Sequence, residues 1–179
     1  MAEHEITVGL VIERITLTGP WSDHVWMPSQ VLMMVPDTPP WTAIMRNGER
    51  VRYFAGAFPV RLHPSSTAQY RDNLTSVRPS LWVAMRPQGS EPPVEIVALT
   101  ADPSEGEGYT ETGTNVVEAI AMPAEIAAWV DAFVTEHHVE RVFEKRKRDP
   151  HRPDSRRPAS SRPDQTKPGP AKPGAGNKG

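Results

Sequence analysis

The segment Ile6-Thr-Val-Gly-Leu-Val-Ile-Glu-Arg14 is the clearest strand pattern in this chain of 179 residues. Aliphatic and β-branched residues alternate along it, which places one set on a single face of a strand: Ile6, Val8, Leu10 and Ile12. Val11 would lie on the opposite face, which indicates that this second face is partly covered as well. We therefore expect a strand over residues 6–14 that contributes to the core.

Further strand patterns, separated by turn residues, follow this first one. Asn47-Gly48 is a strong hairpin signal, because both residues tolerate a positive φ. Pro28 argues that the second strand starts late or lies at a sheet edge. The expected strands after the first cover residues 21–35, 41–46, 50–55, 58–63, 80–86, 94–100 and 115–121.

Three segments are candidates for helices. Residues 65–74 begin with hydroxyl side chains suited to capping, and residues 102–112 form a short acidic segment weakened by Gly106 and Gly108. Residues 123–138 have the strongest helical spacing, with one face formed by Ile126, Trp129, Val130, Phe133 and His137. The strand and helix patterns together predict an α+β fold: a mainly antiparallel sheet with two or three helices on one face.

Charge divides the chain into two parts. Residues 1–144 contain 9 Arg, no Lys and 19 acidic residues, a net charge of −10. Residues 145–179 carry +8 and lack large apolar side chains, so they cannot bury enough surface to offset their ordering entropy. We expect a single globular α+β domain over residues 1–145 and a disordered, basic, Pro-rich tail over residues 146–179.

Most catalytic and ligand-binding signatures are missing from the sequence. The absence of cysteine excludes disulfides, thiol catalysis and Cys-ligated metal sites. No phosphate-binding loop, H-E-x-x-H motif or G-x-S-x-G elbow occurs, and Asp23 and His24 would point to opposite faces of a strand. We therefore predict no catalytic residues, no metal site and no cofactor, which favours a protein that is not an enzyme.

The N-terminus has no signal-peptide pattern, because acidic residues stand where positive charge is required. No apolar run approaches the roughly 20 residues of a membrane-spanning helix. The sequence therefore predicts a cytoplasmic protein with no membrane span.

Trp21-Ser-Asp-His-Val-Trp26 is the most unusual local segment. If it is extended, Trp26 and His24 share a face that would suit docking of a partner protein. The alternative that both tryptophans are core residues is favoured, because a domain of this size needs its large side chains for packing. The candidate partner-binding residues are Trp21, Asp23, His24, Trp26, Lys145, Arg146, Lys147 and Arg148.

The basic tail leaves several interpretations open. It can be a solvated segment, fold back onto the acidic body of its own chain, bind an acidic protein surface, or bind nucleic acid through phosphate charge. No aromatic residues are interleaved for base stacking, so binding of single-stranded nucleic acid in the usual way is disfavoured.

A set of sequence blocks occurs in order along residues 5–148. The blocks are Val8–Arg14, Trp21–Pro28, Trp41-Thr, Tyr53 with Gly56, Tyr70–Leu74, Phe133–Glu140 and Phe143–Arg148. In these blocks the chain resembles a bacterial domain-of-unknown-function family encoded beside formate dehydrogenase genes. Some members of that family are labelled molybdopterin-guanine dinucleotide biosynthesis protein A.

The resemblance implies a non-catalytic accessory protein that assists formate dehydrogenase assembly or maturation, with dehydrogenase subunits as partners. One alternative is an enzyme of molybdenum-cofactor (molybdopterin guanine dinucleotide) biosynthesis. The first strand, however, leads into Ile15-Thr-Leu-Thr-Gly-Pro20 rather than into a nucleotide-binding loop. A second alternative is a nucleic-acid-binding regulator that uses the basic tail.

Overall fold

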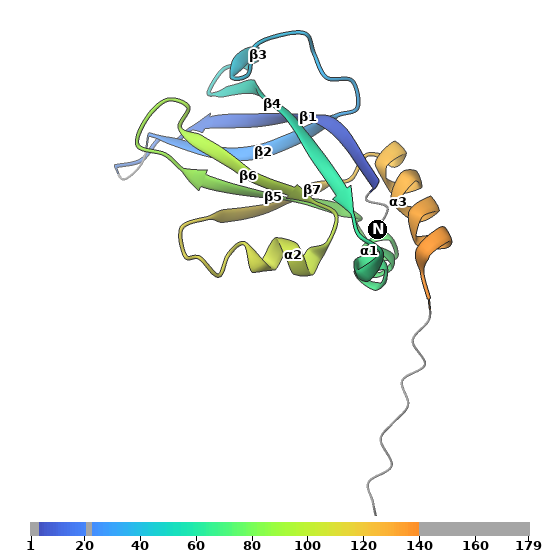
Figure 1. Cartoon of the computed structure of the whole chain (residues 1–179). Coiled ribbons are helices and arrows are strands. Elements are labelled where there is room, and N and C mark those ends of the chain that lie inside the picture. Colours follow the sequence, from blue (N-terminus) through green and yellow to red (C-terminus); the bar gives the residue numbers. More distant parts are fainter. Residues whose placement is uncertain (1–3, 21–22, 140–179) are drawn as a thin grey trace, which may run out of the picture. The chain divides into compact units, whose positions relative to one another are not determined.

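A computed structural model describes residues 4–20 and 23–139 and places their strands in two antiparallel sheets (Figure 1). The first sheet has the strand order β2-β1-β4-β3. It contains β1 (His4–Thr16), β2 (His24–Leu32), β3 (Thr42–Asn47) and β4 (Arg50–Leu62). The second sheet, of order β6-β5-β7, contains β5 (Ser80–Pro87), β6 (Val94–Thr100) and β7 (Val116–Ala121).

The predicted α+β class with mainly antiparallel strands is confirmed, and the strands divide between two sheets instead of forming one. The inward faces of both sheets supply one core, so each sheet covers the apolar face of the other. As the alternation predicted, Val8, Leu10 and Ile12 of β1 lie in this core. They share it with residues of the second sheet, chiefly Leu81, Val83, Met85, Leu99 and Ile120.

Strand β4 is longer than the sequence pattern predicts. Two strands were expected, over residues 50–55 and 58–63, whereas Arg50–Leu62 is continuous and pairs with β1 along its length. Gly56 adopts φ 137°, and the register between β4 and β1 shifts next to it. A glycine tolerates this conformation, so the strand continues through an irregularity where the sequence indicated a break.

Two helices lie together at the end of the sheets where β1 begins and β4 ends (Figure 1). They are α1 (Thr67–Leu74), preceded by a 3₁₀ turn over Pro64–Ser66, and α3 (Ala124–His137). Phe133 of α3 is buried between His4 and Tyr70, with ring centroids 5.0 and 6.2 Å away. Helix α3 therefore closes this helical end against α1 rather than covering the face of one sheet.

The side chain of Asn73 links α1 to the second sheet through hydrogen bonds. Its buried side-chain amide donates to the carbonyl oxygens of Ser80, at 2.8 Å, and Ala101, at 2.9 Å. Its side-chain oxygen accepts from the Ser80 N–H at 3.0 Å. One side chain thereby hydrogen-bonds three backbone groups, two at the start of β5 and one in the segment after β6.

Helix α2 (Pro103–Gly108) is shorter than the expected 102–112 segment and lies beside β5. The Asp102 side chain caps it by accepting from the backbone N–H groups of Ser104 and Glu105. A Cβ at Gly106 would lie only 2.7 Å from Trp82 side-chain atoms. The glycine that weakens the helix in isolation is thus required for its close approach to the sheet.

Candidate partner-binding site

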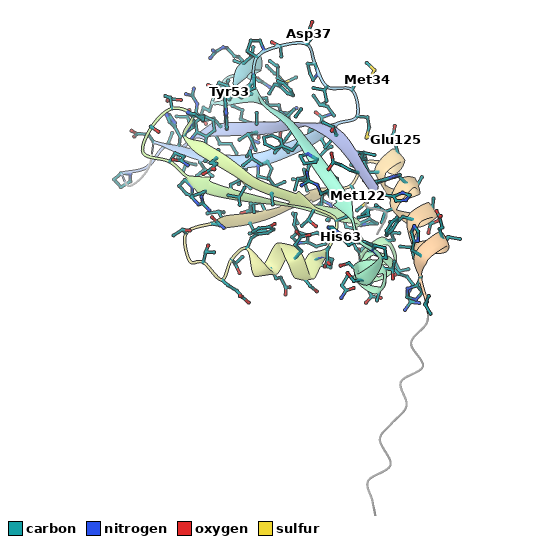
Figure 2. All side chains as sticks on the ribbon, viewed as in Figure 1. Met34, Asp37, Tyr53, His63, Met122 and Glu125 are labelled. Atoms are coloured by element: carbon teal, nitrogen blue, oxygen red, sulfur yellow. The ribbon has the colours of Figure 1, made fainter. Side chains whose placement is uncertain are left out.

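Three aromatic rings gather near the opposite end of the sheets from α1 and α3. Trp26 of β2 meets Trp41 at a centroid distance of 6.2 Å, edge to face, and Tyr53 of β4 at 5.5 Å. All three side chains are half-buried, and the two tryptophans pack against the core. We call this cluster of Trp26, Trp41 and Tyr53 the aromatic end. Figure 2 shows Tyr53 here, toward the far end of β4 from His63.

The backbone at Trp41 is strained. Trp41 has φ 64°, the left-handed region that large side chains rarely adopt, and its N–H donates to the Phe54 carbonyl oxygen at 2.5 Å. Such a conformation costs about 1–3 kcal/mol and is retained where the surrounding structure requires it. The strain accompanies the placement of the Trp41 ring against Trp26.

Two open pockets adjoin the aromatic end. The first, of about 320 Å³, is lined by Trp26, Met85, Pro87, Gln88, Pro93, Val94 and Val116. The second, of about 370 Å³, includes Trp41 and Phe58 and shares Gln88 and Val94 with the first. These volumes are at the lower end of the range for ligand pockets, and the walls are mostly apolar. Such a surface suits anchoring side chains of another protein.

Arg14 brings a positive charge next to these rings. Its guanidinium carbon lies 6.0 Å from the centroid of the Tyr53 ring, within cation–π range. Its Nε is buried and has no hydrogen-bond partner among residues 4–20 and 23–139. The aromatic end therefore combines rings in edge-to-face and tilted contact with a cation that retains hydrogen-bonding capacity.

The residues singled out from the sequence are only partly brought together here. Trp26 lies in the ring cluster, whereas Asp23 and His24 are exposed where β2 begins. Trp21 and the basic residues Lys145, Arg146, Lys147 and Arg148 lie outside the described residues. Trp41, Tyr53 and Arg14 are not among the candidates from the sequence, because side-chain contacts between segments far apart in the chain leave no local pattern.

A more polar pocket, of about 240 Å³, lies beside α2 and includes His63, Glu105 and Tyr109. Glu105 accepts hydrogen bonds from the hydroxyls of Thr100, at 2.6 Å, and Tyr109, at 3.2 Å. Burial and the nearby Glu105 carboxylate raise the pKa of Tyr109, so this hydroxyl remains a donor. These hydrogen bonds stabilise α2. Each carboxylate oxygen of Glu105 already accepts one of them, so Glu105 has a structural role.

Within the described part of the chain, no group of three His, Asp or Glu side chains is arranged to hold a metal ion. No helix in that part is long and apolar enough to cross a membrane.

Comparison with known protein families shows a match. The pattern of a family described as a protein of unknown function, DUF3305, matches residues 7–147. Neither the curated proteins nor the solved structures contain a match to this chain.

Proposed function

The chain belongs to the DUF3305 family, and from this premise we propose that it is a non-catalytic accessory protein whose aromatic end binds a protein partner. The observation that carries the proposal is the packing of the Trp26, Trp41 and Tyr53 rings against one another beside an apolar pocket, with backbone strain at Trp41. Half-buried tryptophan and tyrosine rings are the side chains that most often anchor protein interfaces.

The proposed partner is a formate dehydrogenase, whose assembly or maturation the protein assists. The support is the resemblance of the blocks around Trp21–Pro28 and Phe133–Arg148 to a family encoded beside formate dehydrogenase genes. Trp26 belongs to the first block and Trp41 to another, so part of the resemblance falls on the aromatic end.

Affinity capture of formate dehydrogenase subunits by the full chain tests this proposal. We expect the wild type to retain the subunits and Trp26→Ala to lose them while its circular dichroism is unchanged. Trp129→Ala is a matched control, because Trp129 is also half-buried but lies on α3 at the helical end. Retention by Trp26→Ala would remove the aromatic end from the proposal, and no retention by the wild type would remove the dehydrogenase.

Two further assays separate the alternatives. Isothermal titration with GTP and magnesium is expected to show no binding; saturable micromolar binding, about −8 kcal/mol, would favour an enzyme of molybdenum-cofactor biosynthesis. Salt-sensitive retention of the full chain on DNA, without retention of dehydrogenase subunits, would favour a nucleic-acid-binding regulator.

A further inference from the structure

The outward face of the four-stranded sheet carries a row of side chains that the core does not use. Pairing register aligns Met27 of β2, Glu13 of β1, Arg52 of β4 and Met45 of β3 across all four strands. Because β1 directs Val8, Leu10 and Ile12 into the core, this row lies on the other side of the sheet.

Glu13 is the centre of the row. It is only 7% exposed although it points away from the core. Its carboxylate accepts from Arg50 Nη1 at 2.8 Å and from Arg52 Nε at 3.0 Å. Burial acts to raise the pKa of Glu13, but hydrogen bonds and charge from the two arginines outweigh it, so the pKa lies below the usual value. Glu13 is therefore ionised at neutral pH.

The two arginines have more capacity than Glu13 uses. Two positive charges share one negative charge, which leaves a net charge of +1 in a region, residues 1–144, whose total is −10. Each guanidinium has five N–H donors, and Glu13 takes one from each. The side chains of Arg50 and Arg52 remain 58% and 38% exposed. Buried ion pairs add little net stability. We therefore attribute to Glu13 the role of holding both guanidinium groups in a fixed orientation.

Methionines flank this charged centre. Met27 is 38% and Met45 51% exposed, and Ile44, where the β3–β4 register shifts, is also exposed. Four of the chain's seven methionines, Met27, Met33, Met34 and Met45, are exposed in β2, in β3 or in the segment between them. Figure 2 shows Met34 pointing outward from that segment. Exposed methionine is typical of surfaces that adapt to apolar side chains of a partner.

We propose that this Arg/Met face, formed by Glu13, Met27, Ile44, Met45, Arg50 and Arg52, binds an acidic amphipathic segment of a protein partner. Carboxylates of the segment pair with the guanidinium donors of Arg50 and Arg52 that Glu13 does not use, and its apolar side chains pack on Met27 and Met45. The charge excess selects a negatively charged ligand, and the methionines select a peptide over a phosphate backbone. The face lies on the opposite side of the sheet from the core, so this proposal does not depend on the aromatic end or on the identity of its partner.

A synthetic 18-residue helical peptide with leucines on one face and glutamates on the other is the probe. Its binding to the full chain is measured by fluorescence anisotropy at fixed ionic strength. We expect Arg50→Gln and Met45→Ser each to weaken binding about five- to tenfold. Both substituted side chains are exposed, and Arg52 still pairs with Glu13 in Arg50→Gln, so both variants should fold.

Arg61→Gln is the matched control. Arg61 is also on β4, is 52% exposed and pairs with Glu5 at 2.6 Å, so its substitution should leave peptide affinity unchanged. A peptide with serine in place of leucine tests whether the basic residues 145–179 attract the charge alone; we expect it to bind at least tenfold more weakly.

Three results would overturn the proposal. The first is that the serine peptide binds as tightly as the leucine peptide. The second is that Arg50→Gln and Arg61→Gln lose the same amount of peptide affinity, and the third is that the leucine peptide does not bind whereas a 20-base-pair DNA binds in a manner that depends on Arg50.

Discussion

The two ends of the sheets use aromatic rings in different ways. At the helical end, Tyr70 and Phe133 are buried, and they pack at 6.2 Å within a core closed by α1 and α3. At the aromatic end, Trp26, Trp41 and Tyr53 stay half-buried. Trp26 and Trp41 line open pockets, and Trp41 has a strained backbone. Ring burial at the first end serves stability, whereas incomplete burial at the second leaves ring surface exposed, as the proposed binding of a partner requires.

The largest difference between the ends should appear on truncating Phe133. We expect Phe133→Ala to lower the free energy of unfolding by about 3–5 kcal/mol, because it removes a buried ring and leaves a cavity. Urea denaturation of the full chain measures this loss. An unchanged midpoint would mean that α3 does not close the core.

Asn73→Ala is expected to cost about 2–3 kcal/mol at the helical end. The substitution leaves two carbonyl oxygens and one N–H of the Asn73 network buried without their partner. Urea denaturation again gives the value, with Asn115→Ala as the control, because Asn115 is half-buried and bonds only to Tyr109 and Arg86 among the described residues. Equal losses in the two variants would contradict the special role of Asn73.

Trp26→Ala should destabilise the fold by only about 1–2 kcal/mol, because the ring is half-buried and its removal opens an existing pocket further. Thermal and urea unfolding provide the comparison with Phe133→Ala. Equal losses in the free energy of unfolding for Trp26→Ala and Phe133→Ala would mean that the aromatic end is packed like a second core. That result would contradict the difference between the two ends.

Glu13 is expected to contribute a small pH-dependent stability of about 1 kcal/mol, since the arginines that pair with it are partly exposed. Its pKa is lowered below 4.5 in the folded chain, so the unfolded chain binds more protons between the two values. The contribution is present above pH 4.5 and is lost as pH falls through the folded pKa. Urea unfolding between pH 3 and 7 should show a shallower acid loss in Glu13→Gln than in the wild type; identical slopes would exclude this role.

Deletion of residues 150–179 should have the smallest effect. This segment contains no large apolar side chain, so its removal takes nothing from either end of the core. Melting curves of the full and shortened chains are expected to coincide. A large fall in melting temperature would contradict the division into a domain over residues 1–145 and a tail.

Local sequence patterns predict some elements of the fold and not others. Alternation in residues 6–14 and the Asn47-Gly48 turn led to β1 and to the β3–β4 hairpin, because each pattern depends on neighbours in the chain. The division into two sheets did not follow, since short strands of similar pattern pair equally well in one sheet or two. The continuous β4 was missed because a glycine at position 56 indicates a bend as readily as a bulge.

Candidate site residues show the same limit. Trp26 was selected from its neighbourhood, but its ring partners Trp41 and Tyr53 come from other segments. The triad of Glu13, Arg50 and Arg52 joins residues 37 and 39 positions apart, which only the register of β1 and β4 brings into hydrogen-bonding distance.

Composition and periodicity alone thus establish the α+β class, most of the strands and helices, and the charge contrast between residues 1–144 and 145–179. These properties are local or additive along the chain. Strand order, register and the packing of helices against sheets determine which end is closed, which rings meet and which carboxylate is buried. Those properties arise from contacts between distant segments, whose energies depend on the assembled three-dimensional arrangement and have no signature in any single stretch of sequence.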